Sequence, residues 1–321
     1  DLKWILLNFS KVQASYSLEN KSGRMNTELD ANLMGRNIHS PLEIKIDTIS
    51  SNEGDNSFML NIASKKVEGS VFTNPFNLDL SVLHTGGRSE IYSAGDVNVN
   101  GYILSDGTVN IKTGAGCPIQ SVITGYVHND GFYFNCDEIL GELSDFSPLL
   151  TFDFIAVSNG TVTGNCVISG LASDPEFNGK ISIANPDFNL PIIIPEHFTG
   201  KSLDLTIENS SLVMPETILY VAGVPAYTKL ELNFDRWNFD GLLIEVHTKP
   251  GEYVPADVNL GDVRITGKGR PDLRIYITTT RTDVTGSIDA KETTVSSNGK
   301  VLADAAAMGA ALERGETIEN N

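Results

Sequence analysis

The sequence predicts an all-β protein built as one elongated antiparallel sheet, and three observations predict it. Apolar and polar residues alternate in many short runs, and because successive side chains of a strand point to opposite faces, each run makes one apolar face. Seven Asn-Gly or Asp-Gly pairs are spread along the chain, and such pairs supply the positive φ of tight hairpin turns. The hairpins recur without a fixed period or a composition boundary, which favours a continuous sheet over a compact sandwich.

The alternation becomes clear at Leu42. Residues 1–41 hold only short apolar pieces at 4–7 and 14–18, which we interpret as strands. Residues 42–47 then alternate apolar and charged side chains, a pattern typical of a half-buried strand. Further predicted strands share this pattern, at residues 58–62, 76–82, 97–99, 109–111 and 132–134.

The strongest stretch covers residues 159–246. It contains three clean alternations, at 203–207, 230–234 and 242–246, and an earlier one at 180–183. The pattern continues at Val263 and Ile265 and again from Leu273 to Ile277. Each of these runs predicts a strand whose apolar side chains join one long apolar surface.

The carboxyl end changes character. Residues 302–312 are rich in alanine, and Leu302, Ala305, Ala306, Gly309 and Leu312 fall on one helical face. We therefore expect residues 1–300 to form a continuous β segment and residues 301–321 a short helical or flexible segment against the sheet end.

Composition excludes some partners. The chain has 321 residues and a formal net charge of −18, which repels phosphate backbones, so no nucleic-acid partner is expected. No segment is apolar enough to span a bilayer as a helix. The chain begins at Asp1, and residues 2–7 lack the features of a signal peptide, so we expect a segment of a longer protein.

Residues that could carry catalysis or bind a metal are scattered. The five histidines have no metal-ligand spacing, and no Gly-x-Ser-x-Gly elbow or phosphate-binding loop is present, so we expect neither an enzyme nor a cofactor or metal. Cys117, Cys136 and Cys166 allow two interpretations. They are either three separate thiols or, in an oxidising compartment, one disulfide with one thiol left over.

A family resemblance rests on residues 161–183. Thr163-Gly164, Ser169-Gly170 and the run from Asp174-Pro175 to Gly179-Lys180-Ile181-Ser182-Ile183 resemble the repeats of the TamB family. This family belongs to the AsmA-like superfamily of bridge-like lipid transfer proteins. The resemblance is best over residues 159–285. The Ala-rich acidic end does not look like the β-rich carboxyl end of the family, and no membrane anchor precedes the repeats, so the chain resembles an internal segment.

The resemblance implies a curled sheet, or β-taco, that forms a hydrophobic groove in the periplasm. Such a groove conducts phospholipid acyl chains between the inner and outer membranes and contributes to outer-membrane biogenesis and protein assembly. The implied partners are an inner-membrane anchor outside this segment and an outer-membrane barrel such as TamA. About 20 strands at about 4.8 Å would give a groove of roughly 100 Å. The predicted lining residues are Leu42, Ile44, Ile46, Leu78, Leu80, Val82, Ile181, Ile183, Leu203, Leu205, Ile207, Leu230, Leu232, Phe234, Leu242, Ile244, Val246, Val263, Ile265, Leu273, Ile275 and Ile277.

Two other functions are consistent with the pattern. Each apolar position is also compatible with an ordinary core facing a second layer, and a structural or adhesive β-solenoid with a closed, dry core would use the positions in that way. A carbohydrate-active β-helix enzyme would need several acidic residues clustered on one outer face, and no spacing in the sequence imposes such a cluster.

Overall fold

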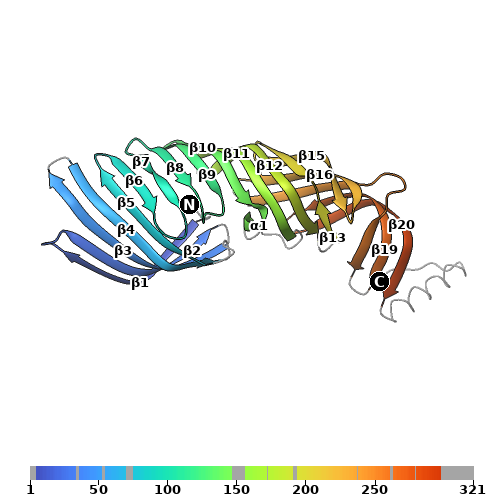
Figure 1. Cartoon of the computed structure of the whole chain (residues 1–321), viewed down its shortest axis with the longest axis horizontal. Helices are drawn as coiled ribbons and strands as arrows, with labels where there is room; N and C mark the ends of the chain where they lie inside the picture. The colour runs from blue at the N-terminus through green and yellow to red at the C-terminus, as the bar shows by residue number, and fades with distance from the viewer. Residues whose placement is uncertain are drawn as a thin grey trace, which may run out of the picture.

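The computed structural model describes residues 5–33, 36–52, 55–69, 75–146, 156–171, 173–190, 194–236, 238–260, 263–278 and 280–297. These residues form one sheet of strands and one short helix, so the prediction of an all-β antiparallel protein is confirmed. The sheet extends along the long axis of the molecule from β1 to β20 (Figure 1). The predicted helix at residues 301–321 lies outside the described residues.

The strands and the helix follow one another in chain order. They are β1 (Ile5–Ser17), β2 (Ser22–Leu33), β3 (Arg36–Asn52), β4 (Asp55–Gly69), β5 (Phe76–Thr85), β6 (Arg88–Ser93), β7 (Val99–Leu104), β8 (Thr108–Thr113), β9 (Gln120–His128), β10 (Gly131–Glu142), α1 (Leu143–Phe146), β11 (Ala156–Leu171), β12 (Asp174–Leu190), β13 (Ile194–Thr199), β14 (Ser202–Glu208), β15 (Ser211–Val221), β16 (Val224–Asp235), β17 (Asn238–His247), β18 (Val254–Leu260), β19 (Val263–Ile277) and β20 (Thr282–Ser297). Among these elements, no helix has the length and hydropathy of a membrane span.

The sheet is an antiparallel meander in which nearly every strand pairs with its neighbour in the chain. Two positions depart from this order. β12 pairs with both β13 and β14, along different parts of its length, so β13 and β14 share one position in the sheet. β17 and β18 share a position beside β19 in the same way. The chain therefore crosses the sheet in fewer steps than it has strands.

The turn residues differ from the prediction. Asp106-Gly107 and Asp130-Gly131 lie at hairpin turns, but the Asn-Gly pair at 178–179 lies inside β12. The pairs at 100–101, 159–160 and 240–241 also lie inside strands, and the pair at 298–299 lies outside the described residues. The turns after β5, β14 and β15 instead use Gly86-Gly87, Asn209-Ser210 and Ala222-Gly223, each with positive φ at both residues. The inference of antiparallel neighbours was correct, although most of the dipeptides were misassigned.

Glycine inside a strand has a structural role other than turn formation here. A Cβ on Gly101 would lie 2.1 Å from the carbonyl oxygen of Asn110 on the neighbouring strand, closer than side chains approach backbone. Gly101 therefore lets β7 and β8 approach each other closely, which is the usual reason for glycine within a strand.

The cluster of buried apolar residues that pack together lies in one half of the sheet. Its residues come from β11 to β19, and we call this part the packed half. β13 contacts β18 although the two strands share no ladder, so the sheet bends back on itself there. In contrast, β1 to β9 make extensive contacts only with their ladder neighbours, among the elements that the structure describes. We call β1 to β10 the open half.

Candidate functional site

One face of the sheet carries a continuous row of apolar residues, which we call the central row. Each member lies directly opposite the next across a strand pair, so the row follows from the register alone. Its members are Tyr16, Gly23, Ile46, Leu60, Val82, Ile91, Gly101, Ile111, Ile123, Cys136, Cys166, Gly179, Ile207, Leu212, Leu232, Leu242 and Ile277. At about 4.8 Å per strand the row spans roughly 75 Å, shorter than the roughly 100 Å expected, because two positions in the sheet are shared.

The face that holds the central row, called here the apolar face, also holds the predicted lining residues. The register places on this apolar face the predicted lining residues of β3, β5, β12, β14, β16 and β17, and those of the described part of β19. Phe234, at the end of β16, is 37% exposed and its ring lies 6.4 Å from that of Phe177. Val263 and Ile265 lie in β19, but their side chains are outside the described part of the structure.

The apolar face is accessible in the open half. Ile46 is 36% exposed, and Leu60, Val82, Ile91 and Ile111 are half-buried. Their burial comes from neighbouring side chains on the same sheet, since β1 to β9 have no extensive contacts with elements beyond their described ladder neighbours. Leu42 is buried, and it lies beside the register shift in β3. The open half thus exposes a surface of aliphatic side chains to solvent.

The same face is covered in the packed half. Phe198 is 1% exposed, Leu242 is 1% exposed and Ile275 is fully buried. Phe198 lies in β13, where the strand meets β18. The predicted lining residues Ile183, Leu203, Leu205, Ile244, Val246, Leu273 and Ile277 belong to this core as well. They therefore face other side chains of the chain itself.

A cavity of about 170 Å³ remains within the packed half. Its walls are aliphatic and aromatic side chains from α1 and from β11 to β17, together with a single threonine. Leu143 of α1 reaches the cavity over Gly160, where a Cβ would lie 3.3 Å from Leu143 and 3.0 Å from Ile183. Glycine at position 160 therefore leaves room for Leu143 to cover the cavity beside Ile183.

The threonine in the cavity wall is Thr228, whose residue is 3% exposed. Its Oγ1 has no hydrogen-bond partner among the described residues. A buried hydroxyl without a partner destabilises a fold by about 1–3 kcal/mol relative to a satisfied one. Thr228 is therefore the one polar side chain among the residues that line this cavity, and its hydroxyl is buried in the wall.

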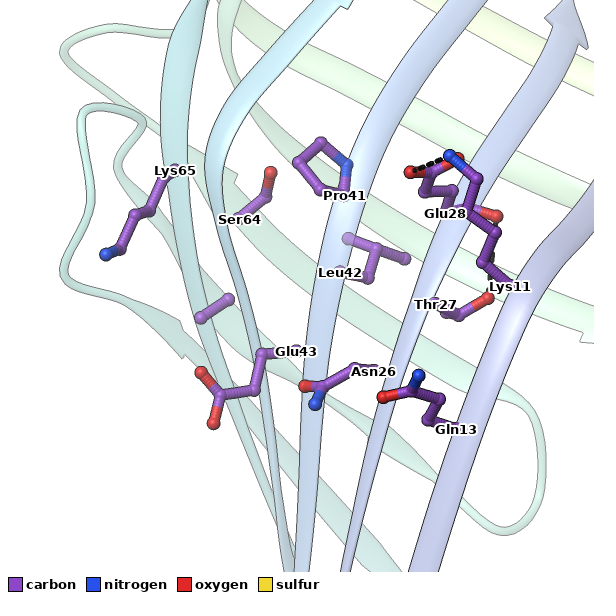
Figure 2. A pocket seen from close by; sticks show the side chains of 11 residues that line it. Lys11, Gln13, Asn26, Thr27, Glu28, Pro41, Leu42, Glu43, Ser64 and Lys65 are labelled. Atoms are coloured by element: carbon purple, nitrogen blue, oxygen red, sulfur yellow. Dashed lines mark hydrogen bonds and ion pairs between the residues drawn. The ribbon is translucent and has the colours of Figure 1, made fainter.

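A larger hollow, of about 430 Å³, lies in the open half (Figure 2). It is lined by residues around the register shifts of β1, β3 and β4. Both carboxylates that line it are paired with a lysine: Lys11 Nζ, also in the lining, lies 2.7 Å from Glu28 Oε1 (Figure 2), and Lys45 Nζ, outside the lining, lies 3.2 Å from Glu43 Oε1. Because these charges are mutually neutralised and exposed, we assign no ligand to this hollow.

The opposite face of the sheet is mainly polar and also carries exposed tyrosines such as Tyr92, Tyr126 and Tyr133. Glu245 illustrates its composition, since its carboxylate lies 3.5 Å from Lys229 Nζ and 3.6 Å from Arg274 Nε. Across the described residues, no group of histidine, cysteine and acidic side chains is arranged to hold a metal ion. The chemistry of the candidate site is therefore that of an extended apolar surface.

Sequence reasoning missed several members of this surface. Ile91, Ile123 and Met25 face the same way as the predicted residues, and the alternation around Leu60 and Ile111 was noticed without their being assigned to the site. The walls of the cavity, including Phe188, Met214 and Thr228, carried no sequence signal that distinguished them from other strand residues.

In comparisons with known proteins, no family model matches the chain, and neither a curated protein nor a solved structure matches it.

Proposed function

We propose that this chain is a segment of a TamB-like, bridge-like lipid transfer protein, and that its apolar face forms the floor of a hydrophobic groove. In this proposal the groove carries phospholipid acyl chains through the periplasm and contributes to outer-membrane biogenesis and protein assembly. An inner-membrane anchor outside the segment and an outer-membrane barrel of the TamA type would complete the assembly. The observation that carries the proposal is the central row, which crosses the whole sheet and is half-exposed along the open half.

The physical argument is the free energy of apolar burial. Each methylene group of an acyl chain that leaves water for an apolar surface gains about 0.8 kcal/mol. In the open half the row presents aliphatic side chains on β3 to β6, β8 and β9, with neighbouring strands about 4.8 Å apart, so an acyl chain meets similar contacts there as it moves. No tight site is required. The net charge of −18 disfavours binding of anionic headgroups, so we expect the protein to bind the acyl tails of the lipid.

The packed half favours a second candidate function. Its core is closed by the contact of β13 with β18, as in a structural or adhesive β-protein with a dry interior. Under the lipid-transfer proposal, this half is a stiff region beside the conducting surface. Under the structural proposal, the open half is covered in the assembled protein.

The test places charge on the apolar face of the open half. Leu60, Val82 and Ile91 are consecutive members of the central row, on β4, β5 and β6. A variant with all three replaced by Asp should bind a fluorescent fatty-acid probe, displaceable by phospholipid, at least about tenfold more weakly, because an acyl chain cannot pass three charges without desolvating them.

The matched control uses the opposite face of the same strands. Asn61, Ser81 and Tyr92 also lie opposite one another on β4, β5 and β6. Their replacement by Asp should change probe affinity less than about twofold. Equal losses in both variants, with the β-sheet circular dichroism of each unchanged, would contradict the proposal. Absence of probe binding to the original chain would contradict it as well.

A further inference from the structure

Two of the three cysteines lie directly opposite each other. β10 and β11 are antiparallel, and their register places Cys136 against Cys166. Side chains of directly opposed residues leave the same face of the sheet with Cβ atoms about 4.5–5.5 Å apart. A disulfide requires Cα atoms about 4.4–6.8 Å apart, which the ladder already provides, and a small approach of the two Cβ atoms. Both residues are free thiols in this structure, and both are partly buried.

Cys117 has a different environment. It lies in the connection between β8 and β9, and its Sγ is 3.4 Å from the carbonyl oxygen of Asn98. Its backbone N–H donates a hydrogen bond to the carbonyl oxygen of Gly114 within the same connection. No described register places another cysteine opposite it.

We propose that Cys136 and Cys166 form a disulfide across β10 and β11 in an oxidising environment, and that Cys117 remains a free thiol. The oxidant is a disulfide, such as oxidised glutathione or a protein disulfide oxidase. One cysteine thiolate attacks the oxidant and forms a mixed disulfide, releasing one reduced thiol. The thiolate of the other cysteine then attacks the sulfur of the first cysteine in the mixed disulfide. This attack forms the Cys136–Cys166 bond and releases the second reduced thiol. In total the pair gives up two electrons and two protons, and the oxidant accepts both.

The surroundings of the two thiols make both of them weak nucleophiles. Burial, the neighbouring Cys166 thiol and the carboxylate of Asp137 raise the pKa of Cys136 to about 11. Burial also raises the pKa of Cys166, but the backbone N–H of Asn178 donates a hydrogen bond that opposes the shift. Since the thiolate is the nucleophile, both raised pKa values predict slow oxidation of this pair near neutral pH.

The bridge would lie in the central row, where the open half meets the packed half. The β10–β11 register shifts immediately after Cys136. A covalent bond next to this irregularity fixes the strand pairing on both sides of it. It also reduces the conformational entropy of the unfolded chain. The proposal rests on register and does not depend on lipid transfer. A serine variant that lacks the bond but still binds the fatty-acid probe would separate the two.

The test uses the complete chain, reduced and then equilibrated with oxidised glutathione. Peptide mapping without reductant should give one linked pair that contains Cys136 and Cys166, and thiol titration in denaturant should give one free thiol per chain. Oxidation should raise the Tm by about 3 to 6 °C. Cys117→Ser should keep the linked pair and the Tm rise, and lose the last free thiol.

Cys136→Ser should lose both the linked pair and the Tm rise. A linked peptide that contains Cys117 would overturn the proposal. Three titratable thiols per chain, at a glutathione ratio that fully oxidises a reference disulfide, would overturn it too. The Cys117→Ser variant keeps the result decisive if Cys136→Ser fails to fold, because it leaves both β10 and β11 unchanged.

Discussion

The rings of Phe188 in β12 and Phe198 in β13 stack with centroids 5.4 Å apart and an interplanar angle of 4°. The two residues are also direct partners in the β12–β13 ladder. Phe198 is the largest fully buried side chain among the described residues, and its strand contacts β18. The same two residues therefore take part in the β12–β13 strand pairing and in the buried core of the packed half.

Removing one of these rings should destabilise the packed half. Phe198→Ala deletes a fully buried ring beside an existing cavity, and such truncations cost about 3–5 kcal/mol. Urea unfolding followed by circular dichroism measures the loss. Phe9→Ala is the control, because Phe9 is 48% exposed and its loss should cost less than about 1 kcal/mol. Equal effects of the two substitutions would mean that Phe198 is not part of a closed core.

Two buried threonines provide a second test. Thr228→Val removes a hydroxyl without a described partner and preserves the side-chain shape, so it should stabilise the chain by about 1–2 kcal/mol. Thr27 is also buried, but its hydroxyl donates a 2.8 Å hydrogen bond to the carbonyl oxygen of Ser10. Thr27→Val should therefore destabilise by about 1–2 kcal/mol. A loss of stability in Thr228→Val would show that its hydroxyl is satisfied after all.

The pKa of Cys136 predicts an unusual alkylation profile in the reduced chain. Its value of about 11, against 9.0 for an ordinary thiol, means that the thiolate fraction keeps rising between pH 9 and 11. The iodoacetamide rate at Cys136, resolved by mass spectrometry, should therefore rise about fiftyfold between pH 9 and 11. In denaturant the rate should level off near pH 9. A plateau near pH 9 in the folded chain would contradict the prediction.

The same shift sets the sign of a pH effect on stability. The folded state keeps the Cys136 thiol protonated where the unfolded state has already ionised it. The associated stability is complete below about pH 9 and is lost as the pH rises toward about 11. Cys136→Ser should remove this alkaline component from the pH dependence of the free energy of unfolding.

The strands and their apolar faces could be predicted because the signal is local. The alternation of Leu42, Ile44 and Ile46 is determined by the two-residue period of a strand, and this period needs no information from distant residues. The predicted residues on described strands consequently lie on one face. Turn assignment was weaker, since Gly179 follows Asn178 inside β12, and a Cβ there would lie 2.3 Å from the carbonyl oxygen of Asn165.

Burial could not be predicted in the same way. Ile46 and Ile275 have similar sequence surroundings, yet the first is 36% exposed and the second is fully buried. The difference comes from the approach of β13 to β18, between strands that form no ladder. The opposition of Cys136 and Cys166 likewise depends on the register between two strands, β10 and β11. Neither the contact of β13 with β18 nor the pairing of the two cysteines can be predicted from the local periodicity of the sequence.

Site-specific photo-crosslinking tests the central claim most directly. A benzophenone side chain at position 62 would stand on the apolar face of β4, because Ile62 pairs with Ile44 and Leu80. At position 61 it would stand on the polar face of the same strand, where Asn61 pairs with Lys45 and Ser81. Irradiation with phospholipid should give a lipid adduct at position 62 and little at position 61. Equal adducts at both positions, or none at position 62, would contradict the proposal that the apolar face carries lipid.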